Sequence, residues 1–390
     1  MHRSVLVVAT LLVFAAVVPG VGAAAITDEP AADAAGSGAV DAVADGGASP
    51  PADHDSETCE FPYETTDATG ADVEIPSDPE RIVTLNPSAA QTMWEIGAQD
   101  EVVGVSQYAS YLDGADEKVN VSGAGGPSVE KVLGTNPDLI LVPNSSYGAA
   151  ADRVEQLRAQ GIPVYVFGQP TSLEFVADKT ERIGRLTGNC EAGTERAAEI
   201  RQSVNHMEEA LEGTERPVGL NVFYGYTSGD DTFIGDLMET AGLRNGAAEA
   251  GISGFQVIND ETVVEMNPGW IVVPEGSPVP ENAAYNSTTA VQEGNIVRVD
   301  TNYLQQPAPR SVQSAEVIMR RVHPEAYEEY RALESGEPTA SPTDDGTPPE
   351  TVTPGTSLTT STPTSTGTPG FGIVVAVIAL AAAALLAGRR

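Results

Sequence analysis

The stretch SVEKVLGTNPDLILVP, residues 128–143, returns as NDETVVEMNPGWIVVP at residues 259–274. Each copy has an acidic residue near its start, Glu130 or Glu261, an Asn-Pro pair in the middle and an apolar run at its end. This order predicts a short capped helix, stopped by Asn-Pro and followed by a buried parallel strand. The repeat indicates two similar lobes, although such units also recur by chance in α/β proteins.

Strands and helices alternate around the first copy. Apolar runs at 81–85, 101–106 and 164–167 predict strands, and the patterns at 89–96 and 149–160 predict helices. The tripeptide Asn-Pro-Ser between the first strand and the first helix is expected to form a turn. Such alternation predicts a parallel, doubly wound sheet, so the fold class is α/β.

The alternation stops in the middle of the chain. Residues 172–186 and 191–211 both have helical patterns, with no strand between them, and the second is long and rich in Glu, Arg and Ala. These helices predict a rigid connector between two lobes. A second lobe then follows, with a strand at 218–224, a turn at 225–231, a helix at 232–241, the repeat copy, a strand at 296–299 and a closing helix from 309 to 323 that can extend to 333.

Seven segments are therefore expected. They are a signal peptide (1–25), an acidic disordered spacer (26–58), an N-terminal lobe (59–170), a helical connector (171–215), a C-terminal lobe (216–335), a Thr/Ser/Pro-rich stalk (336–368) and a C-terminal membrane anchor or sorting signal (369–390).

The N-terminus has the order of a secretory signal. Residues 1–3 carry positive charge, residues 4–18 are almost wholly apolar and residues 22–25 are small. The alternative, an N-terminal membrane anchor, is less favoured because Pro19 and Gly20 end the apolar run short of a bilayer span.

The C-terminus predicts attachment to a membrane. Residues 371–387 are just long enough to span a bilayer, and Arg389 and Arg390 follow them. The tripeptide Pro-Gly-Phe at 369–371 resembles the PGF-CTERM sorting signal of haloarchaeal surface proteins. That resemblance implies that an archaeosortase replaces the helix with a lipid, and the alternative is an uncleaved helix. In either case we expect the protein on the extracellular face of the cell membrane, exported and anchored through its C-terminus.

The chain is strongly acidic. It has 56 acidic and 20 basic residues among 390, a formal net charge of −36, and only three lysines. A field of this sign repels nucleic acid, so no nucleic-acid partner is expected. Acidity spread over the whole chain is typical of proteins from high-salt environments, where screening removes self-repulsion.

Two cysteines, Cys59 and Cys190, occur in a chain predicted to be exported. Export favours a disulfide between them, and two unpaired buried thiols are the alternative.

The pattern of catalytic residue types argues against an enzyme. The four histidines, at 2, 54, 206 and 323, form neither a metal triad nor a Ser-His-Asp set. The glycines at 123, 125 and 126 are not followed by the Lys-Ser/Thr of a phosphate-binding loop. No catalytic residue, metal or cofactor is therefore expected. A passive surface or adhesion protein is a further alternative, but it does not explain the duplicated lobes.

Several stretches together resemble a known family. ERIVTLNPSAAQTMWEIGAQDEVVGVSQYASY (80–111), the first repeat copy, YTSGDDTFIGDLMETAGLRN (226–245) and NYLQQPAPRSV (302–312) are similar to the class III, or helical-backbone, substrate-binding proteins of ABC importers for vitamin B12, ferric siderophores and haem. Within that family the cobalamin-binding members are the most similar. The resemblance implies two Rossmann-like lobes with parallel sheets, joined by one long rigid helix, and a ligand cleft between the lobes.

The resemblance also implies roles for the duplicated acids. Glu130 and Glu261 match the two carboxylates, one per lobe, that pair with arginines of the permease. The alternative is that each only complements the dipole of its own helix, a contribution of about 0.3–1 kcal/mol. The implied partners are the permease and ATPase subunits of a B12-type importer, and a monomer is expected before docking.

The ligand is expected outside the carboxyl ends of the strands, where parallel sheets present their loops. Flat aromatic rings suit a corrin or porphyrin, and amides suit the amide side chains of a corrin. The candidate ligand-binding residues are Tyr108, Phe167, Tyr224, Tyr226, Phe255, Asn302, Tyr303 and Gln306, with further amides at Gln169, Gln256 and Gln305. Core packing is the alternative for each aromatic residue.

The expected function is capture of cobalamin or another corrinoid for import. At positions 302 and 306 the chain has Asn and Gln where the cobalamin binders have an acidic residue and an arginine. This neutral pair favours a neutral, amide-rich ligand. The alternative is a ferric siderophore or haem binding protein of an iron importer.

Overall fold

The computed structural model describes residues 59–336, which lie within one compact unit of the chain. The predicted signal peptide, acidic spacer and C-terminal anchor, and the stalk beyond Gly336, lie outside the described residues. Among the helices of residues 59–336, none has the length and apolarity needed to cross a bilayer.

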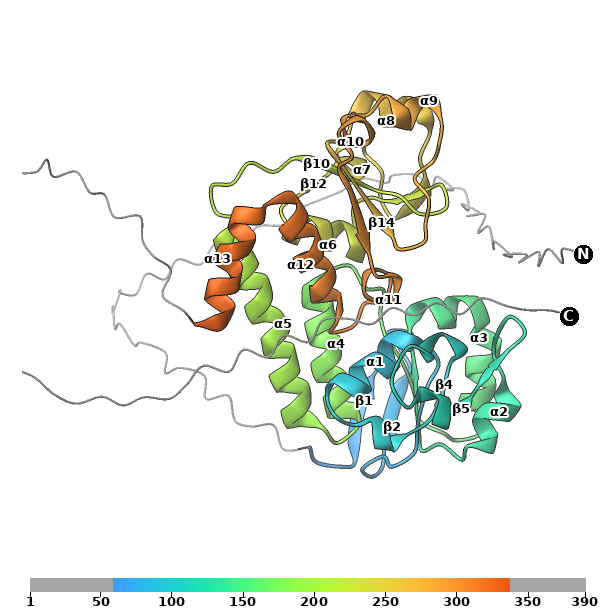
Figure 1. The fold of residues 1–390 in the computed structure, drawn as a ribbon. Helices are drawn as coiled ribbons and strands as arrows, with labels where there is room; N and C mark the ends of the chain where they lie inside the picture. The colour runs from blue at the N-terminus through green and yellow to red at the C-terminus, as the bar shows by residue number, and fades with distance from the viewer. Residues whose placement is uncertain (1–58, 337–390) are drawn as a thin grey trace, which may run out of the picture. The chain divides into compact units, whose positions relative to one another are not determined.

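The N-terminal lobe contains a five-stranded parallel sheet in the order β5-β4-β3-β8-β9 (Figure 1). Its strands are β3 (Ile82–Thr84), β4 (Val102–Val105), β5 (Val119–Asn120), β8 (Leu139–Val142) and β9 (Val164–Val166). Its helices are α1 (Pro87–Glu95), α2 (Val129–Gly134) and α3 (Asn144–Arg158), with short 3₁₀ turns at Gln99–Glu101, Gln107–Ala109 and Ala115–Glu117. Two hairpins complete the lobe, β1 (Tyr63–Thr66) with β2 (Asp72–Ile75), and β6 (Ser122–Gly123) with β7 (Gly126–Pro127).

The C-terminal lobe contains a four-stranded parallel sheet in the order β12-β10-β14-β15. Its strands are β10 (Val218–Asn221), β12 (Arg244–Asn245), β14 (Trp270–Pro274) and β15 (Ile296–Val299), and an antiparallel ribbon pairs β11 (Tyr226–Ser228) with β13 (Phe255–Val257). Its helices are α6 (Phe233–Thr240), α7 (Gly246–Glu249), α8 (Asp260–Met266), α9 (Ala283–Asn286), α10 (Thr289–Glu293), α11 (Thr301–Leu304), α12 (Ser311–Val322) and α13 (Pro324–Ser335).

The sequence repeat is also a structural repeat. Strands β8 and β14 hold the same place in their sheets, each beside the first main strand of its lobe, β3 or β10. The preceding helices are capped alike, because Ser128 Oγ accepts from Lys131 N and Asn259 Oδ1 accepts from Thr262 N. In both copies the Asn before Pro has a left-handed backbone, with φ of 46° at Asn136 and 42° at Asn267. The predicted α/β class with two parallel sheets is confirmed.

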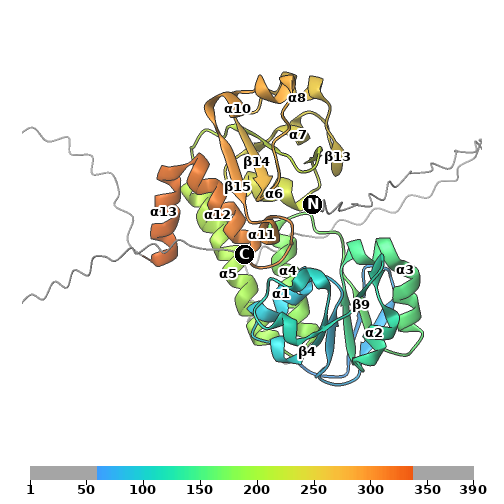
Figure 2. The same ribbon diagram turned by 45° about the vertical axis from the view of Figure 1, so that its right-hand side comes forward.

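Two helices, α4 (Leu173–Leu186) and α5 (Cys190–Ala210), form the connector, where the family resemblance implies one long helix. They pack side by side in both views (Figures 1 and 2). A Cβ on Gly184 of α4 would lie 2.7 Å from Asn189 O and 2.9 Å from Gly193 Cα of α5, so this close approach requires glycine. The first half of α4 is buried in the core of the C-terminal lobe and its second half in a core of the N-terminal lobe. Bending α4 would therefore disturb both cores, which makes the connector stiff.

Several boundaries differ from the prediction. The Asn-Pro-Ser expected as a turn is the start of α1, because Asn86 Oδ1 accepts from Ser88 N and Pro87 fits the first helical position. Helix α3 begins at Asn144 instead of residue 149 and is interrupted at Ala150, which has φ −147° and ψ 38°. The closing helix is two helices, α12 and α13, because Pro324 starts a new one.

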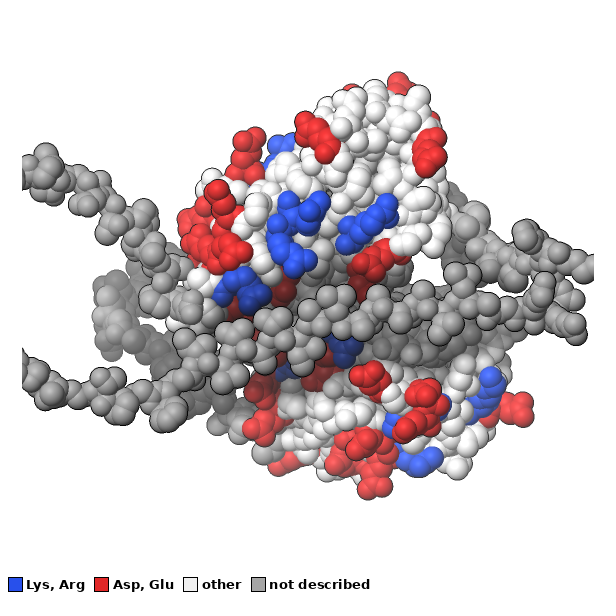
Figure 3. All heavy atoms as spheres, viewed as in Figure 1, with Lys and Arg blue, Asp and Glu red and all other residues white. Residues whose placement is uncertain are grey.

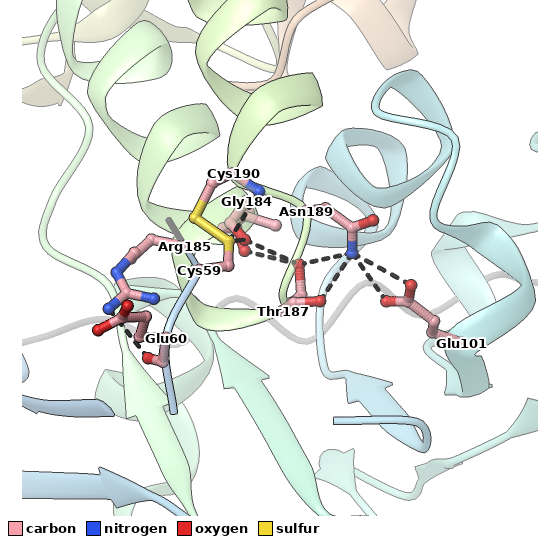
Figure 4. Close-up of a disulfide and its surroundings, with 9 residues drawn as sticks. Cys59, Glu60, Glu101, Gly184, Arg185, Thr187, Asn189 and Cys190 are labelled. Atoms are coloured by element: carbon pink, nitrogen blue, oxygen red, sulfur yellow. Dashed lines mark hydrogen bonds between the residues drawn. A yellow bond between two sulfur atoms is a disulfide. The ribbon is translucent and has the colours of Figure 1, made fainter. Parts of the chain in front are cut away.

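The cysteines form the disulfide that the sequence favoured. Cys59 and Cys190 are bonded, with a Cα–Cα distance of 5.8 Å (Figure 4). Next to the bridge, Asn189 Nδ2 donates to both carboxylate oxygens of Glu101 at 3.1 and 3.0 Å. The bridge thus joins the start of the described chain to the first residue of α5.

Candidate functional site

Glu130 and Glu261 occupy equivalent, exposed positions in the two lobes. Each lies in the first turn of its helix, α2 or α8, and neither forms an ion pair within residues 59–336. Each helix leads back into a central parallel strand, so its N-terminus lies toward the carboxyl edge of its sheet. Both carboxylates are therefore free to pair with groups outside the described part of the chain.

Figure 3 shows groups of acidic side chains on both the upper and the lower part of the described surface, so acidity alone does not mark these two positions. What distinguishes Glu130 and Glu261 is their equivalence under the repeat. The sequence repeat already shows this equivalence. Because the two helices are capped in the same way, Glu130 and Glu261 both lie in the first turn.

The candidate ligand residues gather at the carboxyl edges of the two sheets. Tyr108 follows β4 and Phe167 follows β9 in the N-terminal lobe, while Tyr224 follows β10 and Tyr303 follows β15 in the C-terminal lobe. In a parallel sheet these ends share one edge, where binding loops are commonly placed. Four of the eight candidate residues therefore follow strands at these two edges, and their role in ligand binding stays a prediction. A cleft that joins the two edges remains a prediction.

The exposure of these side chains differs. Tyr108 is 67% exposed, Tyr224 is 78% exposed and Phe255 is 45% exposed, so these three rings are accessible to a ligand. Phe167 is buried, and its ring packs on the edge of Tyr165 with centroids 4.8 Å apart. The position of Phe167 fits the core-packing alternative.

A further aromatic residue, Phe223, packs against two of the candidate residues in the C-terminal lobe. Its ring stacks on Tyr226 at 6.0 Å between centroids and meets Phe255 edge to face at 5.9 Å. Both partners lie on the β11–β13 ribbon, where Ser228 pairs with Phe255. Sequence reasoning missed Phe223, although its place directly after the apolar strand β10 is the same signal that selected Tyr224.

The segment that carries Asn302, Tyr303 and Gln306 is fastened to the N-terminal lobe. Asp300 Oδ1 accepts from Asn302 N at 2.7 Å and caps α11. Just beyond, Arg310 N donates to Gln91 Oε1 at 2.9 Å, and Arg310 Nε donates to Glu95 Oε1 at 2.7 Å. Gln91 and Glu95 are on α1, so these bonds connect the two lobes directly.

Lys179 is a buried lysine at the same junction. Its Nζ donates to Ser88 Oγ of α1 at 3.0 Å and to Pro307 O at 2.6 Å. The side chain is 5% exposed, and Nζ lies 5.9 Å from the centroid of the Phe167 ring. Burial lowers the pKa of Lys179 from 10.5 to about 7, because desolvation disfavours the charged ammonium.

This burial predicts a pH dependence of folding stability. Between about pH 7 and pH 10.5 the unfolded chain holds a proton on Lys179 that the folded chain has lost. The contribution of Lys179 to the free energy of unfolding therefore rises with pH in that window, by about 1.4 kcal/mol per pH unit, and is constant below it. Urea unfolding in constant molar salt should show the rise in the native protein relative to Lys179→Met, and equal slopes for the two proteins would contradict the prediction.

A pocket of about 500 Å³ runs along α4 beside β9. It is lined by Tyr63, Tyr165, Phe167, Gly168, Phe175, Asp178, Lys179, Glu181, Arg182 and Arg185. Its charged groups already have partners, since Arg201 binds Asp178 and Glu181, and Arg182 donates to Tyr63 Oη. Phe167 is the one candidate ligand residue that lines it, so this pocket is not the predicted ligand site.

The histidines within residues 59–336 have structural partners. His206 Nδ1 lies 2.7 Å from Glu334 Oε1, and His323 Nε2 lies 2.9 Å from Gly242 O. In the same part of the chain, no group of three His, Cys, Asp or Glu side chains is arranged to hold a metal ion.

Comparison with known proteins adds a family match. Residues 82–303 match the model of a periplasmic binding protein family, and residues 368–390 match the PGF-CTERM motif. A protein of Halobacterium salinarum named cobalamin-binding protein is 42% identical over 285 residues, which cover 68% of this chain and 75% of that protein. The vitamin B12-binding protein of Yersinia pestis is 28% identical over 198 residues, covering 50% of this chain and 69% of that protein.

Solved structures share the fold. The periplasmic vitamin B12 binding protein BtuF of Vibrio cholerae aligns with a TM-score of 0.55 and 22% identity, over 66% of this chain and 99% of that one. The periplasmic heme-binding protein RhuT from Roseiflexus sp. RS-1 aligns with a TM-score of 0.56 and 24% identity, over 64% of this chain and 99% of that one. At these identities the likeness concerns the fold alone.

Proposed function

The chain belongs to the periplasmic binding protein family, and from this we propose that it is the extracytoplasmic substrate-binding protein of an ABC importer that captures cobalamin or another corrinoid. The observation that supports cobalamin as the ligand is the 42% identity, over 285 residues, to a protein named cobalamin-binding protein. The parallel sheets supply two carboxyl edges bearing exposed aromatic rings, which suit a large flat ligand.

The chemistry of the candidate residues supports a neutral ligand. Asn302 and Gln306, on the segment that follows β15, are both neutral. Haem propionates and many iron chelators are anions, for which a site would be expected to offer arginine or lysine. The nearby Arg310 is engaged by Glu95, and Lys179 is buried. A corrin, with its amide side chains, fits this set better.

Delivery requires docking to the permease, for which we assign Glu130 and Glu261. Both are exposed and without ion pairs among the described residues, and they stand at equivalent turns of α2 and α8. Two such carboxylates, one per lobe, can each form a charge-assisted pair with an arginine of the permease. The partners are the permease and ATPase of a B12-type importer.

The protein acts, in this proposal, as a binder and not as an enzyme. Its family consists of binding proteins, and His206 and His323 are used in structural hydrogen bonds. The PGF-CTERM motif supports an exported protein anchored through its C-terminus on the extracellular face of the membrane.

Calorimetric titration in molar salt tests the ligand. The protein is titrated separately with cyanocobalamin, haem and a ferric hydroxamate siderophore. We expect tight one-to-one binding of the corrinoid alone. Binding of only the iron ligands would move the function to iron uptake while keeping the fold and the docking role. Binding of none would leave a surface protein without this transport role.

The aromatic group around Phe223 should contribute to affinity. In Phe223→Ala, Tyr226 and Phe255 each lose a ring contact worth about 0.5–1.5 kcal/mol, so the ribbon that presents them loosens. We expect about 10-fold weaker binding of cyanocobalamin by calorimetry. Tyr63→Ala, at a half-buried aromatic residue on β1, serves as the control and should bind normally. Equal affinity of the two variants would place the Phe223 group outside the site.

A further inference from the structure

A polar seam joins helix α1 to the segment that follows α11. On α1, Ser88, Gln91 and Glu95 are spaced three and four residues apart and therefore share one face. Each bonds a group outside its own lobe: Ser88 accepts from Lys179 of the connector, and Gln91 and Glu95 accept from Arg310. We call the five residues Ser88, Gln91, Glu95, Lys179 and Arg310 the α1 seam.

Lys179 is the member that bridges three parts of the fold. It belongs to the connector helix α4, and its Nζ reaches both Ser88 Oγ of the N-terminal lobe and Pro307 O of the C-terminal lobe. Pro307 directly follows Gln306, and α11 with Asn302 and Tyr303 lies only a few residues earlier. The bridge thus ends beside three of the candidate ligand residues.

A buried lysine at this place calls for an explanation beyond stability. Desolvation opposes its charge, and apolar side chains of similar size usually stabilise such a position as well or better. Ser88 Oγ and Pro307 O are both acceptors, which match the donors of a lysine amine. An amine at this position can donate to both acceptors. Lys179 therefore connects helix α1 to the segment that contains Pro307.

We propose that Lys179 is a positioning residue for ligand binding, which holds the segment carrying Asn302, Tyr303 and Gln306 at a fixed place relative to helix α1. The inference rests on the proposed function, because it assigns a part in ligand binding. A segment held in place before the ligand arrives need not be ordered on binding, and this preorganisation raises affinity.

The proton on Lys179 modulates this hold. Desolvation disfavours the ammonium, so the arrangement in which the amine is buried between Ser88 Oγ and Pro307 O is more stable once the proton is lost. Burial alone shifts the pKa of Lys179 to about 7, so the change occurs near neutral pH. The charged groups on the surrounding elements have partners of their own: Asp178 and Glu181 on α4 bind Arg201, Glu95 on α1 binds Arg196 and Arg310, Asp236 on α6 accepts from Leu173 N, and Asp300 before α11 accepts from Asn302 N.

The first arm of the test uses the ligand-free protein. Amide hydrogen exchange is compared between the native protein, Lys179→Met and the control Lys131→Met, which removes an exposed lysine that also donates to a backbone carbonyl. The amides of Tyr303, Leu304 and Gln305 are bonded only within their own turn. In Lys179→Met they should exchange about 10-fold faster, because the segment opens locally more often, and in Lys131→Met they should be unchanged.

The second arm measures affinity for cyanocobalamin at about pH 6 and about pH 8.5. Native affinity should rise about fivefold as pH rises, since the buried amine loses the proton that desolvation disfavours and the segment is then held more firmly. Lys179→Met should bind about 10-fold more weakly than the native protein at the higher pH and show no pH dependence. Lys131→Met should follow the native profile.

The outcomes separate the inference from the proposed function. Unchanged exchange of residues 303–305 in Lys179→Met, or a native affinity profile in that variant, overturns the positioning role. If the native protein binds no cyanocobalamin at either pH, the proposed function fails, while the exchange arm still decides whether Lys179 holds the segment. Should Lys179→Met fail to fold, Ser88→Ala removes one acceptor, and a native exchange pattern and pH profile in it would overturn the inference.

Discussion

Import of cobalamin should be lost when Glu130 and Glu261 are both replaced by glutamine, while affinity for the ligand stays at the native value. Each carboxylate is exposed in the first turn of its helix and has no ion pair within residues 59–336. Charge-assisted hydrogen bonds to arginine contribute about 1.5–3 kcal/mol each. Removing two therefore weakens docking by about 10²–10⁴-fold. Each single substitution should give a partial loss.

The measurement is uptake of labelled cobalamin by cells whose own binding protein has been replaced by the variant, alongside calorimetry of the purified variant. A matched control is the pair Glu265→Gln and Asp152→Asn, which removes one exposed acid from α8 and one from α3. The control removes the same charge from the same two lobes and should support native uptake. Equal loss of ligand affinity in the Glu130 and Glu261 variant would show that these acids belong to the ligand site or the fold instead.

Loss of the disulfide should lower the free energy of unfolding by about 2–5 kcal/mol. The bridge closes a loop with a sequence separation of 131 residues, so the unfolded chain gains much conformational freedom without it. The folded state should change little, because Arg185 still holds the N-terminal segment. Its Nη2 donates to Glu60 O at 3.1 Å, and its guanidinium lies 4.1 Å from the centroid of the Tyr63 ring.

Thermal unfolding of a double variant, Cys59→Ser with Cys190→Ser, tests this. A loss of this size corresponds to a melting temperature about 10 °C lower in a protein of this length. Reducing agent should lower the melting temperature of the native protein to that of the variant and leave the variant itself unchanged. A variant as stable as the oxidised native protein would show that the unfolded chain gains little from losing the bridge.

The elements that sequence predicted well are those encoded by neighbouring residues. The repeat unit required only a cap, an Asn-Pro stop and an apolar run, and all three formed in both copies, down to the left-handed backbone of Asn136 and Asn267. The positions of Tyr108, Tyr224 and Tyr303 after strands also followed from local order. Their roles in ligand binding and those of the other candidate residues stay predictions.

Other features depend on residues that are far apart in the chain. The β11–β13 ribbon pairs Tyr226 with Val257 across helices α6 and α7, and it is this pairing that brings Phe255 to Phe223. The β1–β2 hairpin, which sequence reasoning did not predict, has one face open to solvent and only a weak apolar pattern. Local periodicity cannot report such pairings, because their energy comes from tertiary contacts.

By itself, the sequence determined the two parallel lobes, the helical connector and the duplicated acids, since caps, stops and apolar runs act within a few residues. The tertiary structure alone decided that Lys179 is buried and that it joins Ser88 to Pro307, residues separated by most of the chain. In the sequence Lys179 is an ordinary polar position of an amphipathic helix. Lys179 lies at the seam because α4 is packed into both lobes. This packing excludes water from the amine, which would be solvated on an isolated helix, and so lowers the pKa of Lys179.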